Sequence, residues 1–260
     1  MKPKQKNKKV AIIYRSIPHY RRDFYYLLRD SLQLQNITLV LIYGQPGKNE
    51  SQKKDTLDID WARKIENKIM YIGKREIFWQ PVLRHLEGVE LIIVEQASKL
   101  LVNYLLLLHN ALGIHKLAFW GHGKNFQQSS ASRVGEWVKR ILSKRVHWWF
   151  AYNEFSAQIV ESMGFPKDRI TCVQNAIDTK ALREELRSLK PDDIQIARKQ
   201  LRIKTNNIAI YSGGLYPEKR ISFLLESLHY LRRRITDFEM IIIGDGVDAH
   251  LITEEVKTNP

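Results

Sequence analysis

Short apolar runs recur along the first two thirds of the chain, with polar or amphipathic stretches between them. The runs have the length of strands and are continuous rather than alternating, which is typical of parallel strands buried on both faces. This strand and helix rhythm predicts an α/β fold. The expected strands are 10–14, 37–43, 68–73, 91–95, 116–121, 148–153 and 169–175, and the expected helices are about 22–33, 98–112, 131–146 and 154–163.

The same rhythm restarts after a polar, helix-prone stretch. "IAIYSGG" (208–214) and "FEMIIIGDG" (238–246) have the composition of strands, and a helix is expected between them from about 219 to 234. We therefore expect two Rossmann-like domains with parallel sheets, the second one incomplete. The expected divisions are a basic tail at 1–9, a first domain at 10–178, a connector at 179–205 and the start of a second domain at 206–260.

The single cysteine and the apolar runs exclude several classes of protein. One cysteine, Cys172, cannot form a disulfide framework or a cysteine-based metal site. Arg15 interrupts the apolar run behind the basic N-terminus, so we expect no secretory signal peptide. The longest apolar stretch, 100–108, is too short to span a bilayer and reads as a buried helix. We expect a cytoplasmic protein.

The formal net charge of +14 is unevenly distributed. Residues 1–180 hold 29 Lys and Arg against 16 Asp and Glu, whereas residues 181–260 hold 13 against 12. A basic first half suits an anionic partner such as a membrane surface, a nucleic acid or a phosphorylated substrate. Because no recognised nucleic-acid motif accompanies it, we expect no nucleic acid and consider peripheral binding at the inner face of the membrane.

Three loops stand where open parallel sheets bind their ligands, at the carboxyl ends of strands. They are "RSIPHYRRDF" (15–24), "GHGKNF" (121–126) and "GGLYPEKR" (213–220). In the third loop, glycines allow close backbone approach, and Lys219 stands at the start of a helix whose dipole favours a phosphate. The alternative is an ordinary strand-to-helix turn with a solvated lysine.

The segment from about 150 to 246 resembles family 4 glycosyltransferases of the GT-B fold. The similarity lies in the order of "YNEFSAQIVESMGF", "GFPKDRI", "NAID", "GGLYPEKR" and "GDG". It implies transfer of a sugar from a nucleotide-diphosphate sugar to a lipid-linked or cell-envelope glycan, with retention at the anomeric carbon. No cofactor and no obligatory metal are implied. Catalysis in such a site is mainly electrostatic.

The resemblance also assigns the donor side. Lys219 matches the lysine that grips the diphosphate, in a loop with Gly213, Gly214 and Arg220. The family often has an arginine where this chain has Gly214, so Arg220 or the backbone must supply the second contact. The donor nucleotide loop is expected at the "G-x-G" turn, with Gly244 and Gly246.

The first domain holds the expected catalytic residue and the acceptor side. His122 matches the histidine that the family presents to the donor sugar, although it could instead cap a strand end in a tight turn. An anionic acceptor is expected to meet the basic residues of the first loop and the glycine-rich loop. The acceptor-side residues are Arg15, His19, Arg21, Arg22, Gly121, Gly123 and Asn125.

Two other functions stay open. A nucleotide-sugar epimerase of the same fold would need carboxylates and histidines for proton transfer in both domains, and the motifs do not display them. A non-catalytic basic protein that binds a membrane or nucleic acid is the other alternative. Because only 55 residues follow position 205, we expect this chain alone to bind a donor weakly and to transfer no sugar.

Overall fold

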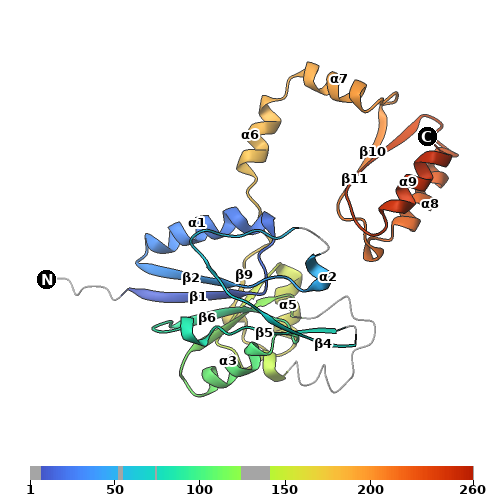
Figure 1. Cartoon of the computed structure of the whole chain (residues 1–260). Coiled ribbons are helices and arrows are strands. Elements are labelled where there is room, and N and C mark those ends of the chain that lie inside the picture. Colours follow the sequence, from blue (N-terminus) through green and yellow to red (C-terminus); the bar gives the residue numbers. More distant parts are fainter. Residues whose placement is uncertain (1–6, 52–54, 74, 124–140, 260) are drawn as a thin grey trace. The chain divides into compact units, whose positions relative to one another are not determined.

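A computed structural model describes residues 7–51, 55–73, 75–123 and 141–259 of the chain (Figure 1). The chain divides into two compact units, unit 1 (Met1–Asp178) and unit 2 (Thr179–Pro260). Both units are built on parallel strands joined by helices, so the predicted α/β class is confirmed. In the described part of the chain, no helix is both long and apolar enough to cross a membrane.

Unit 1 contains a seven-stranded sheet in the order β3-β2-β1-β6-β7-β8-β9, in which every pairing is parallel. Since all carboxyl ends of these strands lie at one edge, the loops that follow them are brought together there. The strands are β1 (Lys8–Tyr14), β2 (Ile37–Tyr43), β3 (Arg63–Lys64), β6 (Leu91–Glu95), β7 (Lys116–Gly121), β8 (Trp148–Ala151) and β9 (Ile170–Cys172).

Helices cover both faces of this sheet, as the continuous apolar strands predict. Figure 1 shows α1 (Arg22–Gln33) on one side and α3 (Val102–Ala111) on the other. Ile12 and Tyr14 pack with Tyr25 of α1, whereas Ala11 and Ile13 belong to the core beneath α3 and α5 (Glu154–Ser162). The short helix α2 (Lys48–Ser51) follows β2.

The strand expected at 68–73 forms, but it does not belong to the main parallel sheet as expected. β4 (Lys68–Ile72) pairs antiparallel with β5 (Arg75–Trp79) in a hairpin outside the main sheet. Gly73 adopts a φ of +58°, which permits the tight turn after β4. Tyr71 and Ile72 are exposed, so this apolar run is not a buried one.

Other boundaries shift by a few residues. β1 begins at Lys8, inside the expected basic tail, and α3 begins at Val102 rather than near 98. β8 and β9 are shorter than the apolar runs that predicted them. Most of the helix expected at 131–146, and the acceptor-side residue Asn125, lie outside the described residues.

Unit 2 contains two parallel strands, β10 (Asn207–Ser212) and β11 (Phe238–Ile243). Ile210 at 65% and Ile243 at 56% are more than half exposed, so neither strand is covered as completely as the strands of unit 1. The expected connector contains two helices. The helices of unit 2 are α6 (Lys180–Ser188), α7 (Pro191–Gln200), α8 (Ile221–Arg232) and α9 (Ala249–Thr258).

Candidate functional site

The loop after β7 places His122 between two glycines that the backbone requires. A Cβ atom on Gly121 would lie 2.9 Å from the Cβ of Gln96, and Gly123 has a φ of +74°, which side chains other than hydrogen rarely tolerate. The Gln96 side chain donates to the carbonyl of Gly123 over 3.1 Å. Residues 121–123 are therefore held tightly against the sheet, and His122 has a defined position.

His122 itself is exposed at the carboxyl edge of the sheet but anchored on one side. Its Nδ1 lies 2.9 Å from Oγ of Ser156, a buried residue in the first turn of α5. Its ring centre is 4.4 Å from that of Tyr152. Partial burial lowers the pKa of His122, which favours the neutral imidazole at neutral pH. A neutral, oriented imidazole can donate or accept a hydrogen bond.

Arg15, expected to meet an anionic acceptor, is engaged by carboxylates of its own chain. Its guanidinium lies 2.5 Å from Glu50 and 3.6 Å from Glu95, and Lys99 lies 3.5 Å from Glu50. Two cations and two carboxylates therefore balance one another here. A neutral, hydroxyl-rich ligand suits this network better than a free anion does.

Arg21 lies in a different environment, nearly buried among aromatic rings. It is 3% exposed, and Nη2 donates to the Asn175 side chain over 2.7 Å. Burial alone would lower the pKa of Arg21, but the neighbouring tyrosines, with Tyr14 first, together raise that pKa. Arg21 therefore stays charged. Its guanidinium carbon lies 5.1–5.8 Å from the ring centres of Tyr14, Tyr20, Trp120 and Tyr152.

Arg22 and His19 do not join these residues. Nδ1 of His19 lies 3.3 Å from the backbone carbonyl oxygen of Asp55. The guanidinium of Arg22 lies 5.7 Å from the ring centre of Tyr26, on the outer side of α1. The expected acceptor side is therefore not a single cluster.

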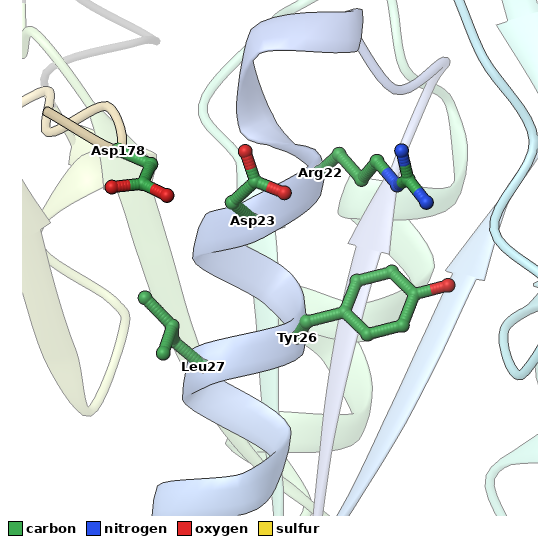
Figure 2. Close-up of a pocket in the computed structure, with 5 residues that line it drawn as sticks. All are labelled: Arg22, Asp23, Tyr26, Leu27 and Asp178. Carbon is green, nitrogen blue, oxygen red and sulfur yellow. The ribbon is translucent and has the colours of Figure 1, made fainter. Parts of the chain in front are cut away.

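A hollow of about 300 Å³ lies beside α1. Figure 2 shows Arg22 and Tyr26 pointing to one side of the helix, while Asp23 and Leu27 project toward Asp178. Of the predicted acceptor-side residues it contains Arg22 alone. We place the candidate site at the carboxyl edge of the sheet rather than in this hollow, because the buried polar side chains gather at that edge.

In unit 2, the predicted diphosphate loop joins β10 to α8. Lys219 is exposed in a short 3-10 turn, and Arg220 precedes α8 in a left-handed conformation with a φ of +55°. The N-cap residue of α8, Arg220, makes no side-chain capping hydrogen bond. The guanidinium of Arg220 lies 5.2 Å from the ring centre of Phe223. Cationic side chains and an uncapped helix N-terminus can hold a phosphate.

The glycines of unit 2 let its two loops touch. A Cβ on Gly244 would lie 1.9 Å from the carbonyl oxygen of Gly213, and one on Gly246 would lie 2.2 Å from that of Leu215. The backbone N–H of Leu215 donates to the backbone carbonyl oxygen of Asp245 over 2.9 Å. Gly214 lies under the ring of Tyr216, whose atoms a Cβ would meet at 2.4 Å. These glycines therefore fix the shape of the two loops that the sequence predicts to bind the donor.

No known family profile matches the chain, and no curated protein sequence is recognisably similar to it. Solved structures are similar. A glycosyltransferase from Rickettsia africae aligns with a TM-score of 0.58 and 15% identity, over 98% of this chain and 65% of its own. HepE from Anabaena, solved with UDP, aligns with a TM-score of 0.56 and 14% identity, over 96% of this chain and 65% of its own.

A UDP-GlcNAc 2-epimerase from Methanocaldococcus jannaschii, solved with UDP-GlcNAc and UDP, aligns with a TM-score of 0.51 and 15% identity. The alignment covers 96% of this chain and 71% of the epimerase. This chain has the GT-B fold. It spans about two thirds of the length of these proteins, and identities this low establish the fold alone.

Several residues of the candidate site lie outside every sequence motif, so the sequence analysis did not select them. Tyr14 ends β1, Trp120 is the second-last residue of β7, Tyr152 follows β8 and Asn175 follows β9. Each occupies the carboxyl edge, so the rule that ligands bind there could have selected them. Glu95, the last residue of β6, could have been selected in the same way. Across the described residues, no group of three or more His, Cys, Asp or Glu side chains could hold a metal ion.

Proposed function

We propose that this chain is the nucleotide-sugar-dependent part of a retaining glycosyltransferase that acts on a lipid-linked or cell-envelope glycan. The observation that carries the proposal is the loop of unit 2, in which Lys219 and the uncapped N-terminus of α8 follow a glycine-bearing turn. The GT-B fold supports it, because the similar HepE was solved with UDP and with UDP-glucose.

In the proposed reaction, unit 2 binds the diphosphate of the donor. The ammonium of Lys219 and the N–H groups of α8 stabilise the negative charge that grows on the leaving diphosphate. His122 hydrogen-bonds to the donor sugar as a neutral imidazole that Ser156 orients. The acceptor hydroxyl is held at the carboxyl edge of unit 1, and positioning supplies much of the rate. We propose no metal and no cofactor.

Lys219→Ala tests the donor site directly. Loss of one hydrogen bond to a charged group should weaken nucleotide-sugar binding by about tenfold or more. Lys257→Ala, at an exposed lysine of α9, is the matched control and should bind the donor like the wild type. Isothermal titration with a nucleotide sugar makes the comparison. Equal donor affinity in wild type and Lys219→Ala would remove the diphosphate site from unit 2.

The basic first half also supports a proposed peripheral association with anionic membranes, where a lipid-linked acceptor would lie. Each basic residue near the surface contributes roughly 1 kcal/mol at low salt. Vesicles that contain phosphatidylserine should co-sediment the protein, neutral vesicles should not, and high salt should release it. Equal sedimentation with both vesicles, or binding insensitive to salt, speaks against a membrane-bound acceptor.

A nucleotide-sugar epimerase is the second candidate, and one observation favours it. Glu50 and Glu95 lie together beside Arg15, and each has a buried carboxylate oxygen without a hydrogen-bond partner. Such carboxylates could carry the proton transfers that inversion of a sugar carbon requires. Incubation with UDP-GlcNAc in D₂O separates the candidates. Deuterium in the recovered sugar ring without any acceptor indicates an epimerase, whereas a glycosyltransferase returns the unlabelled sugar.

A further inference from the structure

Arg21 is a buried positive charge whose hydrogen bonds are incomplete. It is 3% exposed, and among the described ion pairs none involves it. Nη2 donates to the neutral side chain of Asn175, while Nε is buried and has no acceptor. The aromatic rings around Arg21 compensate part of the lost hydration. A buried charge normally has a counter-ion, so this arrangement points to an anion that the chain does not supply.

Two more donors in the same cluster are unused. The hydroxyl of Tyr25 and Nε1 of Trp120 are both buried and have no acceptor. Trp120 lies with its ring centre 5.1 Å from the Arg21 guanidinium carbon. Tyr25 and Trp120 belong to the same buried cluster of side chains. Burial raises the pKa of Tyr25, so the phenol remains an O–H donor. Unmade hydrogen bonds of buried groups are costly, and native structures contain few of them.

The carboxylate of Glu95 does not complete this cluster. Glu95 influences the pKa values of Tyr14 and Tyr25, so its charge reaches these phenols. Its described ion pair is with Arg15, at 3.6 Å, and not with Arg21. The cluster therefore combines one positive charge with three buried donor groups that have no acceptor, namely Nε of Arg21, the hydroxyl of Tyr25 and Nε1 of Trp120.

The ring of Tyr152 connects the cluster with His122 at the carboxyl edge of the sheet. The ring of Tyr152 is 5.2 Å from the Arg21 guanidinium carbon and 4.4 Å from the ring of His122, which is exposed. We propose that Arg21, Tyr25 and Trp120 bind the phosphate group of the acceptor, next to His122. A phosphate offers at least three acceptor oxygens, one for each unused donor, whereas a carboxylate offers two. This inference rests on the proposed function, because it identifies the acceptor as phosphorylated.

Inorganic phosphate and a conservative variant test the site. Tyr25→Phe removes a hydroxyl that has no partner in the chain, so folding should not suffer. All six tryptophans lie in unit 1, so their fluorescence reports phosphate bound there. Phosphate is titrated into the Lys219→Ala variant, so that the proposed diphosphate site of unit 2 contributes little. The ionic strength is kept constant with chloride as the competing anion. Phosphate should bind this background saturably, and Tyr25→Phe should weaken it about tenfold.

Tyr71→Phe, at an exposed tyrosine of the β4–β5 hairpin, is the matched control and should leave phosphate affinity unchanged. Arg21→Lys should also weaken phosphate binding, because it keeps the charge but loses the Nε donor. Equal fluorescence responses to phosphate and chloride, or equal phosphate affinity in Tyr25→Phe and its parent, would overturn the site. Ordered water would then be the partner of the unused donors.

A kinetic measurement separates this inference from the proposed function. In a preparation that transfers sugar, Tyr25→Phe should raise KM about tenfold for a phosphate-bearing acceptor and leave KM for the nucleotide sugar unchanged. An unchanged acceptor KM overturns the phosphate site while the transferase function stands. Saturable, Tyr25-dependent phosphate binding by a chain that binds no nucleotide sugar supports the site and overturns the proposed function instead.

Discussion

Replacing His122 with alanine is expected to lower turnover about a hundredfold in a preparation that transfers sugar. Loss of one preorganised polar contact to the reacting sugar typically has this effect. The imidazole is oriented by Ser156 at 2.9 Å and lies between Gly121 and Gly123, where a larger side chain would clash or strain the backbone. Turnover is measured with saturating donor and acceptor.

Two further variants make the His122 experiment specific. Ser156→Ala leaves the imidazole but removes its anchor, and should lower turnover less than His122→Ala does. His85→Ala changes a half-buried histidine that contacts Arg63, outside the candidate site, and should retain wild-type turnover. Because burial lowers the pKa of His122, turnover that depends on the neutral ring should fall only under acidic conditions. Turnover of His122→Ala within threefold of wild type would show that the histidine only caps the strand end.

Replacing Trp149 with alanine is expected to lower the free energy of unfolding of unit 1 by about 3–5 kcal/mol. Trp149 is 0% exposed in the middle of unit 1, where its ring lies 5.5 Å from Phe119. Its Nε1 donates to the carbonyl of Ser143 over 2.9 Å. The substitution therefore leaves both a cavity and an unpaired buried carbonyl.

Urea unfolding followed by tryptophan fluorescence measures this loss in unit 1 alone, because all six tryptophans lie there. Trp148→Ala is the matched control. Trp148 is only half-buried and bonds to Thr171, so its replacement should cost clearly less. Equal losses for the two neighbours would mean that Trp149 does not occupy the core.

The main sheet was predictable because its strands are buried on both faces. A strand such as β6, with Ile92 and Val94 on one side and Ile93 on the other, can only be apolar throughout. The run at 68–73 is also mostly apolar, yet it forms a strand of a hairpin outside the main sheet. Its hydrophobicity cannot distinguish the two outcomes, since the exposure of Tyr71 depends on which partner strand is nearby.

The candidate site was only partly predictable, for a different reason. His122 and Lys219 stand beside glycines, which leave a signal in the sequence. Arg15 and Arg21 are six positions apart in one basic loop. The local sequence does not indicate that Arg15 pairs with carboxylates while Arg21 lies in an aromatic cluster. Their partners, Glu95 and Asn175, come from β6 and from the segment after β9. Only the folded sheet brings these residues together.

The most direct test of the account is binding of nucleotide sugars to the chain, measured by saturation-transfer NMR with uridine, guanosine and adenosine diphosphate sugars. The proposed function predicts saturation of both base and sugar protons for at least one of the three donors, with loss of the signal in Lys219→Ala. Absence of saturation with every nucleotide sugar, together with a salt-sensitive mobility shift of random duplex DNA, would contradict it and indicate a basic nucleic-acid-binding protein.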